Sequence, residues 1–240
     1  MVAGVRWGLG VTPFTSTASL LYTLLAGAFE AVYFMTLARA LEKGPLGAVY
    51  TVSRGGAVLV VWPLSIVLFH EIVTATSASG SGLVLAGLVL CGVGAHGVRV
   101  AGDKSGASGV TWAVLCAISI AGYHLSYKAA LQTGGASSAT FAISLSLSGL
   151  ISLVRIDRRE LRAVFQRRWP RIALMGFVCG GSFLILMEAL ALGGSGYVLT
   201  LRNTSVLFAA GLAYFIGERP AHAELVGAAL VAGGAVLMAW

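Results

Sequence analysis

The sequence predicts an all-α polytopic membrane protein with about eight transmembrane helices. Of its 240 residues, 58% are hydrophobic and only 10% are charged, whereas a soluble domain carries about 25% charged residues. The mean hydropathy is +0.89. The apolar residues form runs of roughly 20, the length that a helix needs to cross a bilayer. Because backbone groups inside lipid must bond to one another, each run is expected to be a helix.

Eight apolar runs are separated by short polar joints, and they follow a segment, 1–18, that lacks the apolar core of a signal peptide. The expected spans are 19–40, 46–69, 80–100, 109–127, 137–154, 171–192, 195–216 and 221–240. Pro63 lies inside the second span, where we expect a kink. Small residues recur at four-residue spacing, as at Gly27 and Ala31, which favours close helix packing.

The basic residues gather in the joints and indicate a membrane orientation. The net charge is +7, and the joint 155–171, RIDRRELRAVFQRRWPR, carries seven arginines. Basic loops stay on the cytoplasmic side, so we expect loop 155–171 to be cytoplasmic and both termini to lie outside. An amphipathic patch on anionic lipid is the alternative reading of this joint. The charge therefore reports on topology, and no nucleic-acid partner is expected.

Two parts of the chain resemble each other. GPLGAVYTVSRGGAVLVVWPLSIVLFHE, followed by GSGLVLAGLVLCG, matches GGSGYVLTLRNTSVLFAAGLAYFIGE, followed by ELVGAALVAGG. The matched pairs are Gly47 with Gly196, Arg54 with Arg202, Glu71 with Glu218 and Gly82 with Gly227. Since Arg54 lies in the second span and Arg202 in the seventh, five steps and so an odd number later, the copies are expected to cross the membrane in opposite directions. Inverted repeats are typical of transporters, whose substrate site lies near the midplane where the repeats meet.

These two stretches resemble the later helices of two EamA domains. IGERP at 216–220 keeps the form of the family's Gly-Glu-Arg-like turn, whereas the first copy has FHEIV at 69–73. GVTWAVLCAISIAGYHLSYKAAL, 109–131, resembles the opening helix of such a domain. The resemblance implies a carrier of the drug/metabolite transporter (DMT) superfamily, whose members are built from two inverted five-helix repeats.

The resemblance also implies the domain organisation. It divides the chain into an N-terminal segment, 1–18, a partial first EamA repeat of three helices, 19–100, and a second repeat of five helices, 109–240. The first copy is therefore apparently shortened at its N-terminal side, through either a start further upstream or a degenerate first repeat. Carriers of this kind have both termini in the cytoplasm, opposite to the orientation that the charge count indicates.

Two arginines inside spans are the leading candidates for substrate binding. Arg54 lies near the middle of the second span, roughly 13 Å along the helix, and an arginine at that depth costs about 2.5–3.5 kcal/mol on insertion scales. Arg202 lies nearer the start of its span. Each is expected either to bind an anionic substrate group through its fork of donors or to pair with buried carboxylates or helix-end carbonyls.

Four further ionisable residues complete the candidate set. Glu30 and Glu188 are the carboxylates available within spans, and we expect either proton coupling or a counter-ion role for them. His124 and Lys128 lie four residues apart on one helix face. They are expected to line a substrate cavity, or to lie at the interface with a snorkelling lysine.

The expected function is secondary transport of a small organic metabolite, with an anionic substrate as one option, across the plasma membrane by alternating access. The expected partners are the lipid bilayer, the substrate and, as a further option, a second copy of the chain. No cofactor or metal is expected, because no Cys, His, Asp and Glu residues have metal-ligand spacing. The alternative is a non-transporting, truncated or accessory membrane protein that a partner chain completes.

An enzyme is not expected. GGSG at 193–196 fits the Gly-x-Ser-Gly form of intramembrane serine proteases. Such enzymes need a base within hydrogen-bond reach of the serine. His222 follows the next span and is expected near the opposite face of the membrane.

Overall fold

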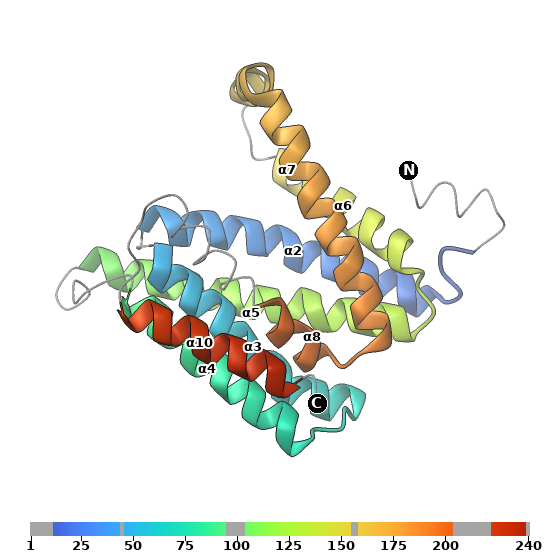
Figure 1. The fold of residues 1–240 in the computed structure, drawn as a ribbon. Helices are drawn as coiled ribbons and strands as arrows, with labels where there is room; N and C mark the ends of the chain where they lie inside the picture. Colours follow the sequence, from blue (N-terminus) through green and yellow to red (C-terminus); the bar gives the residue numbers. More distant parts are fainter. Residues whose placement is uncertain (1–11, 44–45, 95–103, 155–157, 204–221, 239–240) are drawn as a thin grey trace. The chain divides into compact units, whose positions relative to one another are not determined.

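The protein's structure, a computed structural model, describes residues 12–43, 46–94, 104–154, 158–203 and 222–238. Secondary structure in these residues is helical, apart from an isolated bridge between Phe14 and Gly135. The helices are α2 (Thr17–Lys43), α3 (Leu46–Phe69), α4 (Ala75–Gly94), α5 (Lys104–Gln132), α6 (Ser137–Leu153), α7 (Arg158–Leu192), α8 (Ser195–Arg202) and α10 (His222–Met238). The expected all-α class is confirmed for the described part of the chain (Figure 1).

The helices coincide with the expected runs except at some ends. The seventh expected span is described only as far as Arg202 in a helix, and its remainder, with Glu218, lies outside the described residues. The expected loop 155–171 is instead helical from Arg158 onward. Its arginines, leucine, alanine and glutamine are good helix formers, so charge alone did not make it a loop. The helix α3 continues through Pro63 to Phe69.

Four helical segments of the described chain are long and apolar enough to cross a membrane: Thr17–Lys43, Val52–Phe69, Ser108–Gln132 and Leu161–Leu192. Shorter apolar helical segments are Ala75–Leu90, Ser137–Leu153 and Leu225–Gly234. Large apolar side chains such as Leu21, Val67 and Phe177 are exposed. Lipid covers such residues at no cost, so this surface is that of an integral membrane protein.

The chain folds as two compact units. Unit 1 comprises Met1–Ala31 and Leu125–Gly193, and unit 2 comprises Val32–His124 and Gly194–Trp240. The helices α2 and α5 contribute residues to both. Unit 1 also contains α6 and α7, and unit 2 contains α3, α4, α8 and α10.

Unit 1 contains a close helix approach and an aromatic contact between its helices. A Cβ added to Gly27 of α2 would lie 2.8 Å from the carbonyl oxygen of Ser144 on α6. Only glycine permits that approach, because any side chain would collide with the backbone. The rings of Phe141 on α6 and Phe183 on α7 stack with their centroids 5.8 Å apart.

Unit 2 is built around the pair α4 and α10, which lie side by side (Figure 1). Val84 and Leu88 of α4 pack against Val231 of α10 in a buried cluster. A second cluster joins Ala40 of α2, Val49 of α3 and Ala113 of α5. The two alanines of the second cluster let the helix backbones come close.

The crossing of α4 and α10 is reciprocal. A Cβ added to Gly87 would lie 2.5 Å from the carbonyl oxygen of Gly227, and a Cβ added to Gly234 would lie 2.5 Å from that of Gly80. Each glycine of α10 follows its α4 counterpart by 147 positions, which is also the spacing of the two helix-end glutamates. On this geometry Gly227 corresponds to Gly80, two residues before the Gly82 that the sequence alignment paired with it.

The reciprocal crossing predicts a sharp difference between two adjacent glycines. Gly234→Ala forces a Cβ against the α4 backbone and is expected to destabilise the protein by about 1–3 kcal/mol. A Cβ on Gly233 would meet nothing within 4 Å, so Gly233→Ala should be neutral or stabilising by up to about 1 kcal/mol. Thermal unfolding of the two purified variants in detergent, followed by circular dichroism, measures the difference. Equal midpoints would contradict the close crossing.

Candidate functional site

The helix α8 ends in an arginine that a buried tyrosine holds in place. Nη1 of Arg202 donates a hydrogen bond of 3.1 Å to the Tyr123 hydroxyl oxygen. Tyr123 lies on α5 and is 1% exposed. Its ring meets that of Tyr33, from α2, edge-on at 5.7 Å between centroids. The guanidinium is therefore oriented by a fixed aromatic pair of unit 2, while the arginine as a whole stays partly exposed.

His124 adjoins this group and is fully buried. Its ring lies 5.3 Å from that of Tyr123, and neither ring nitrogen has a hydrogen-bond partner among the described residues. Arg54 and Arg202 both lie within electrostatic range of His124 and of Tyr33. The sequence-predicted Arg54, Arg202 and His124 thus share one neighbourhood of unit 2. We refer to these two arginines with Tyr33, Tyr123 and His124 as the arginine–tyrosine cluster.

The arginine–tyrosine cluster has the chemistry of an anion site. A guanidinium offers several donors in a fork that matches carboxylate or phosphate, and a neutral imidazole adds one donor and one acceptor. Buried polar atoms are rarely left without a partner, so the two ring nitrogens of His124 need an explanation. A polar group of a substrate would supply one.

The carboxylate of Glu71, which follows the end of α3, positions the start of α8. The backbone N–H of Ser195 donates a hydrogen bond of 2.6 Å to Oε1 of Glu71, and a Cβ on Gly194 would lie 2.9 Å from Oε2. An anion at a helix N-terminus is favoured because the first N–H groups lack partners within the helix. The sequence places Glu71 at the end of a span but does not reveal this contact, because its partner is a backbone group of another helix.

Trp62 holds the same helix from its side. Its indole Nε1 donates a hydrogen bond of 3.1 Å to Oγ1 of Thr200, and its ring lies 2.8 Å from where a Cβ of Gly196 would be. Glycine at that position lets α8 lie flat against the indole. Together the cap and the indole fix the axis and rotation of α8, and so the direction of Arg202.

Unit 1 carries the predicted carboxylate Glu30 in a buried chain of hydroxyl groups. Oη of Tyr127 donates a hydrogen bond of 3.0 Å to Oε2 of Glu30 and lies 2.7 Å from Oγ of Ser144. Ser144 in turn donates to the Phe141 carbonyl at 3.1 Å. Glu30, Tyr127 and Ser144 are all at most 1% exposed. We call these three residues the Glu30 chain.

The hydrogen bonds of the Glu30 chain can form whether the Glu30 carboxyl is ionised or protonated. When Glu30 is ionised, the Tyr127 hydroxyl donates to it, and Ser144 can donate to Tyr127. When Glu30 is protonated, it donates to Tyr127, which donates to Ser144, which donates to the carbonyl. Each hydroxyl has one proton and can also accept, so one proton added at Glu30 reverses the direction of the chain without moving a heavy atom.

Lys128 and Glu188 occupy different places in unit 1. Nζ of Lys128 donates hydrogen bonds of 2.8 Å to the carbonyl of Leu190 and 2.6 Å to that of Gly193. Lys128 is only 7% exposed, and it satisfies the carbonyls that the end of α7 leaves without helical partners. Glu188 is exposed on α7.

Sequence reasoning overlooked Tyr33 and Ser144 as members of these groups. Tyr33 could have been noticed, because it follows Glu30 by three residues and lies on an adjacent part of the same helix face. Serines are so common between residues 137 and 152 that nothing distinguished Ser144. Ser195 of the GGSG motif is buried, and its hydroxyl has no hydrogen-bond partner in the described part of the chain. That part also has no group of three or more His, Cys, Asp or Glu able to hold a metal.

Comparison with known proteins gives one family and one fold. The model of the EamA-like transporter family matches residues 107–240. No curated protein matches. A solved structure described as "Crystal structure of protein" is similar with a TM-score of 0.75 and 18% identity, over 99% of this chain and 82% of that chain. At that identity the likeness concerns the fold alone.

Because of the hydrogen bond from Ser195 to Glu71, we expect replacement of Glu71 to cost more stability than replacement of an exposed glutamate. Glu71→Ala removes the acceptor at the start of α8 and should destabilise the protein by about 0.5–2 kcal/mol, as expected for a lost helix cap. Glu42→Ala removes an exposed partner of Arg39, at 3.8 Å, and should cost less than about 1 kcal/mol. Thermal unfolding of both purified variants in detergent checks this. A smaller loss for Glu71→Ala than for Glu42→Ala would argue against the cap.

Proposed function

The chain belongs to the EamA-like transporter family, whose model matches more than half of its length, and from that premise we propose that it is a secondary transporter of a small organic anion. As a family member with apolar helices, it is a DMT-type membrane transporter. The observation that carries the substrate class is the arginine–tyrosine cluster, where Arg202 is oriented by Tyr123 beside the unsatisfied nitrogens of His124.

The proposed mechanism is alternating access between two inverted repeats, a partial one over 19–100 and a second over 109–240. The reciprocal glycine contacts of α4 and α10 support it, since a two-fold relation converts each contact into the other. Arg54 on α3 and Arg202 on α8 lie within electrostatic range of the same two side chains, as expected if matched helices face one substrate. Inverted repeats allow the two halves to rock around such a site.

We further propose that the protein lies in the plasma membrane with the basic segment 155–171 in the cytoplasm. The seven arginines of that segment support the orientation. Both termini would then be external when eight spans are present. We propose no enzymatic reaction for this protein. A homodimer is compatible with the proposal.

Substitution of the cluster arginines should stop transport without stopping insertion. Arg202→Gln and Arg54→Gln each remove a charged donor set, and losing a hydrogen bond to a charged group is worth roughly 10- to 100-fold in rate. The measurement uses proteoliposomes loaded with an equal mixture of amino acids, small carboxylates and sugar phosphates, with efflux quantified by mass spectrometry. Arg39→Gln, on the exposed end of α2, is the matched control and should keep wild-type efflux.

The same assay separates the main alternative, a non-transporting membrane protein completed by a partner chain. That protein would give no efflux of any compound above protein-free liposomes. Efflux restricted to uncharged or cationic compounds would keep the transporter and remove the anion assignment. Wild-type efflux from both arginine variants would remove the proposed site.

For the coupling ion we propose a proton carried by Glu30. The support is the Glu30 chain, which hydrogen-bonds either protonation state with the same heavy-atom positions. An arrangement that serves both states equally well is suited to a group that must gain and lose a proton in each cycle. Glu188, exposed on α7, is the second candidate.

Replacement of Glu30 should uncouple transport from the pH gradient. Glu30→Gln keeps the size and hydrogen bonding of the side chain but cannot exchange a proton. It should abolish efflux driven by a pH gradient and leave substrate exchange at equal pH within about threefold of wild type. Efflux rates with and without an imposed gradient measure this, and Glu42→Gln is the control. Loss of gradient-driven efflux in Glu188→Gln, with Glu30→Gln unaffected, would transfer the role to Glu188.

A further inference from the structure

The helix α7 consists of two segments that meet at a bend. Arg168 has non-helical backbone angles, φ −130° and ψ 16°, and Pro170 follows inside the helix. Proline has no N–H and its ring displaces the preceding turn, so a bend next to it is expected. A basic segment, Arg158–Arg167, precedes the bend, and the apolar segment Arg171–Leu192 follows it.

The bend encloses a strongly basic pocket. Its volume is about 400 Å³, and it is lined by Arg167, Arg168, Pro170 and Arg171. Three of the four lining residues are arginines, and like charges gathered around one pocket repel one another unless an anion lies among them. Guanidinium groups bind phosphate through paired, charge-assisted hydrogen bonds. The pocket therefore has the chemistry of a phosphate site.

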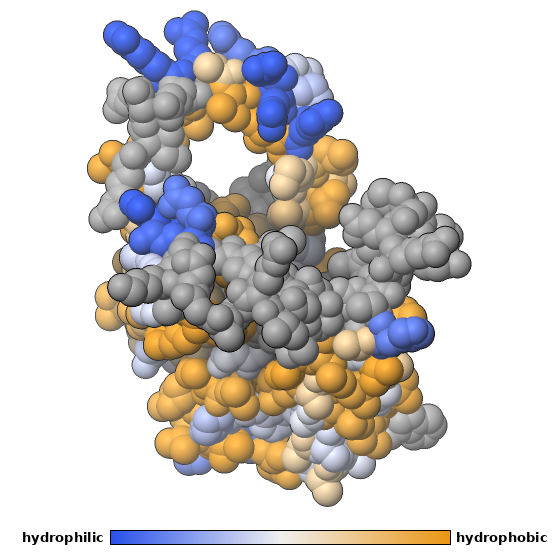
Figure 2. All heavy atoms as spheres, turned by 90° about the vertical axis from the view of Figure 1, so that its left-hand side faces the viewer, coloured by the Kyte–Doolittle hydropathy of each residue, from blue (hydrophilic) through white to orange (hydrophobic). Residues whose placement is uncertain are grey.

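The position of the pocket along α7 corresponds to the depth of lipid headgroups. From Arg171 to Leu192 the helix is roughly 33 Å long at 1.5 Å per residue, close to the thickness of about 30 Å of a bilayer's hydrocarbon core. When this segment spans the membrane, the arginines lie at the boundary of that core. Figure 2 shows hydrophilic side chains gathered at this end of α7, with hydrophobic ones beyond them.

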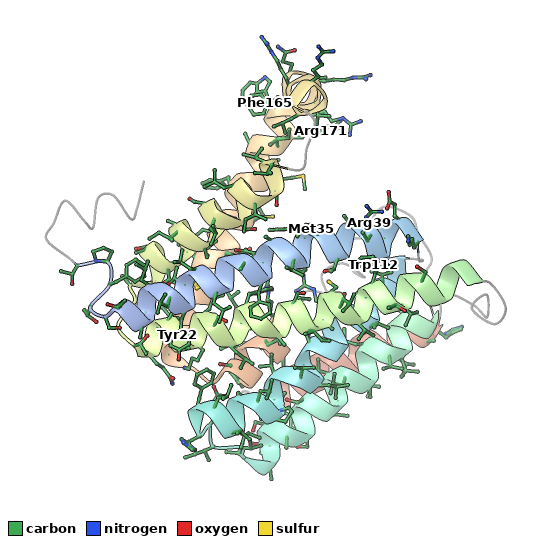
Figure 3. The ribbon with its side chains drawn as sticks, turned by 180° about the vertical axis from the view of Figure 1, so that it is seen from behind. Tyr22, Met35, Arg39, Trp112, Phe165 and Arg171 are labelled. Atoms are coloured by element: carbon green, nitrogen blue, oxygen red, sulfur yellow. The ribbon has the colours of Figure 1, made fainter. Side chains whose placement is uncertain are left out.

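The side chains around the pocket are those of a membrane interface. In the first segment, Leu161, Val164 and Phe165 are spaced to share one helix face and are 39%, 52% and 57% exposed. Trp169, at the bend, is 58% exposed, and tryptophan is enriched at the level of the headgroups. Figure 3 shows Phe165 and Arg171 at the same end of α7. A helix with such a basic and apolar division lies in the plane of the interface.

We propose that the pocket at the α7 bend binds the phosphate of an anionic phospholipid headgroup. Free phosphate offers the same oxygen acceptors, but it would leave the exposed apolar residues on both sides of the pocket in water. A phospholipid matches both features, because its phosphate reaches the arginines while its acyl chains cover Trp169 and Ile172. The proposal is independent of transport, since no residue of the arginine–tyrosine cluster or the Glu30 chain takes part.

The test compares two double variants of the full chain in detergent. Arg167→Gln with Arg171→Gln removes two pocket arginines, and Arg159→Gln with Arg162→Gln removes the same charge from the preceding segment. Thermal unfolding is followed while phosphatidylglycerol or phosphatidylcholine is added. We expect phosphatidylglycerol to stabilise the wild type at lower concentration than phosphatidylcholine does. The pocket variant should need roughly fivefold more phosphatidylglycerol for each arginine removed, and the control variant should respond within about twofold of wild type.

Three outcomes would overturn the proposal. Equal responses of the wild type to the two lipids would show that the headgroup charge does not matter. Equal losses in the two double variants would indicate diffuse attraction rather than a pocket. Equal stabilisation by glycerol phosphate and by phosphatidylglycerol would assign the site to a soluble anion. Should the pocket variant fail to fold, Arg167→Lys with Arg171→Lys replaces it. That variant keeps the charge but loses the fork, and an unchanged preference for phosphatidylglycerol in it would count against phosphate recognition at the pocket.

Discussion

Two charged side chains satisfy backbone groups at helix ends, one at the end of α7 in unit 1 and one at the start of α8 in unit 2. Lys128 donates hydrogen bonds to the carbonyls at the end of α7, and Glu71 accepts one from the first amide of α8. The last carbonyls and first amides of a helix have no partners within that helix. The signs are also those that the helix dipoles favour, a cation at the C-terminus and an anion at the N-terminus.

The orientation of the candidate anion site follows from the contact at the start of α8. The cap fixes where α8 begins, Trp62 fixes the helix from the side, and Arg202 lies at its other end, as the last of its eight residues. A shift of one residue in that start would rotate the arginine by about 100° around the helix axis and away from Tyr123. Glu71 thus acts on the site through the position of a helix. Glu71 itself has no donor to offer an anion, and its role at the candidate anion site is to position α8.

Much of the helical arrangement could be predicted from the sequence, because an apolar run of membrane length satisfies its own backbone hydrogen bonds in lipid by forming a helix. Arg54, Arg202 and His124 could also be selected, since charge and imidazole are rare in such runs. Their partners could not be predicted in the same way. Lys128 bonds to backbone carbonyls 62 and 65 positions away, and every residue has a carbonyl. The helical start of α7 at Arg158 was missed because a basic run fits a loop and an interfacial helix equally well.

The pair α4 and α10 indicates which parts of the fold can move. Its backbones meet at glycines where a Cβ would come within 2.5 Å of a carbonyl oxygen, so sliding one helix along the other would bring side chains into that space. Packed interfaces of this kind have discrete arrangements and do not deform continuously. We infer that α4 and α10, one from each proposed repeat, keep these contacts while the two halves rock about the crossing. The conformational changes must then occur at contacts made by a few polar groups, such as the hydrogen bond of Arg202 to Tyr123. There a substrate oxygen can replace one partner of the hydrogen bond without disturbing the packing.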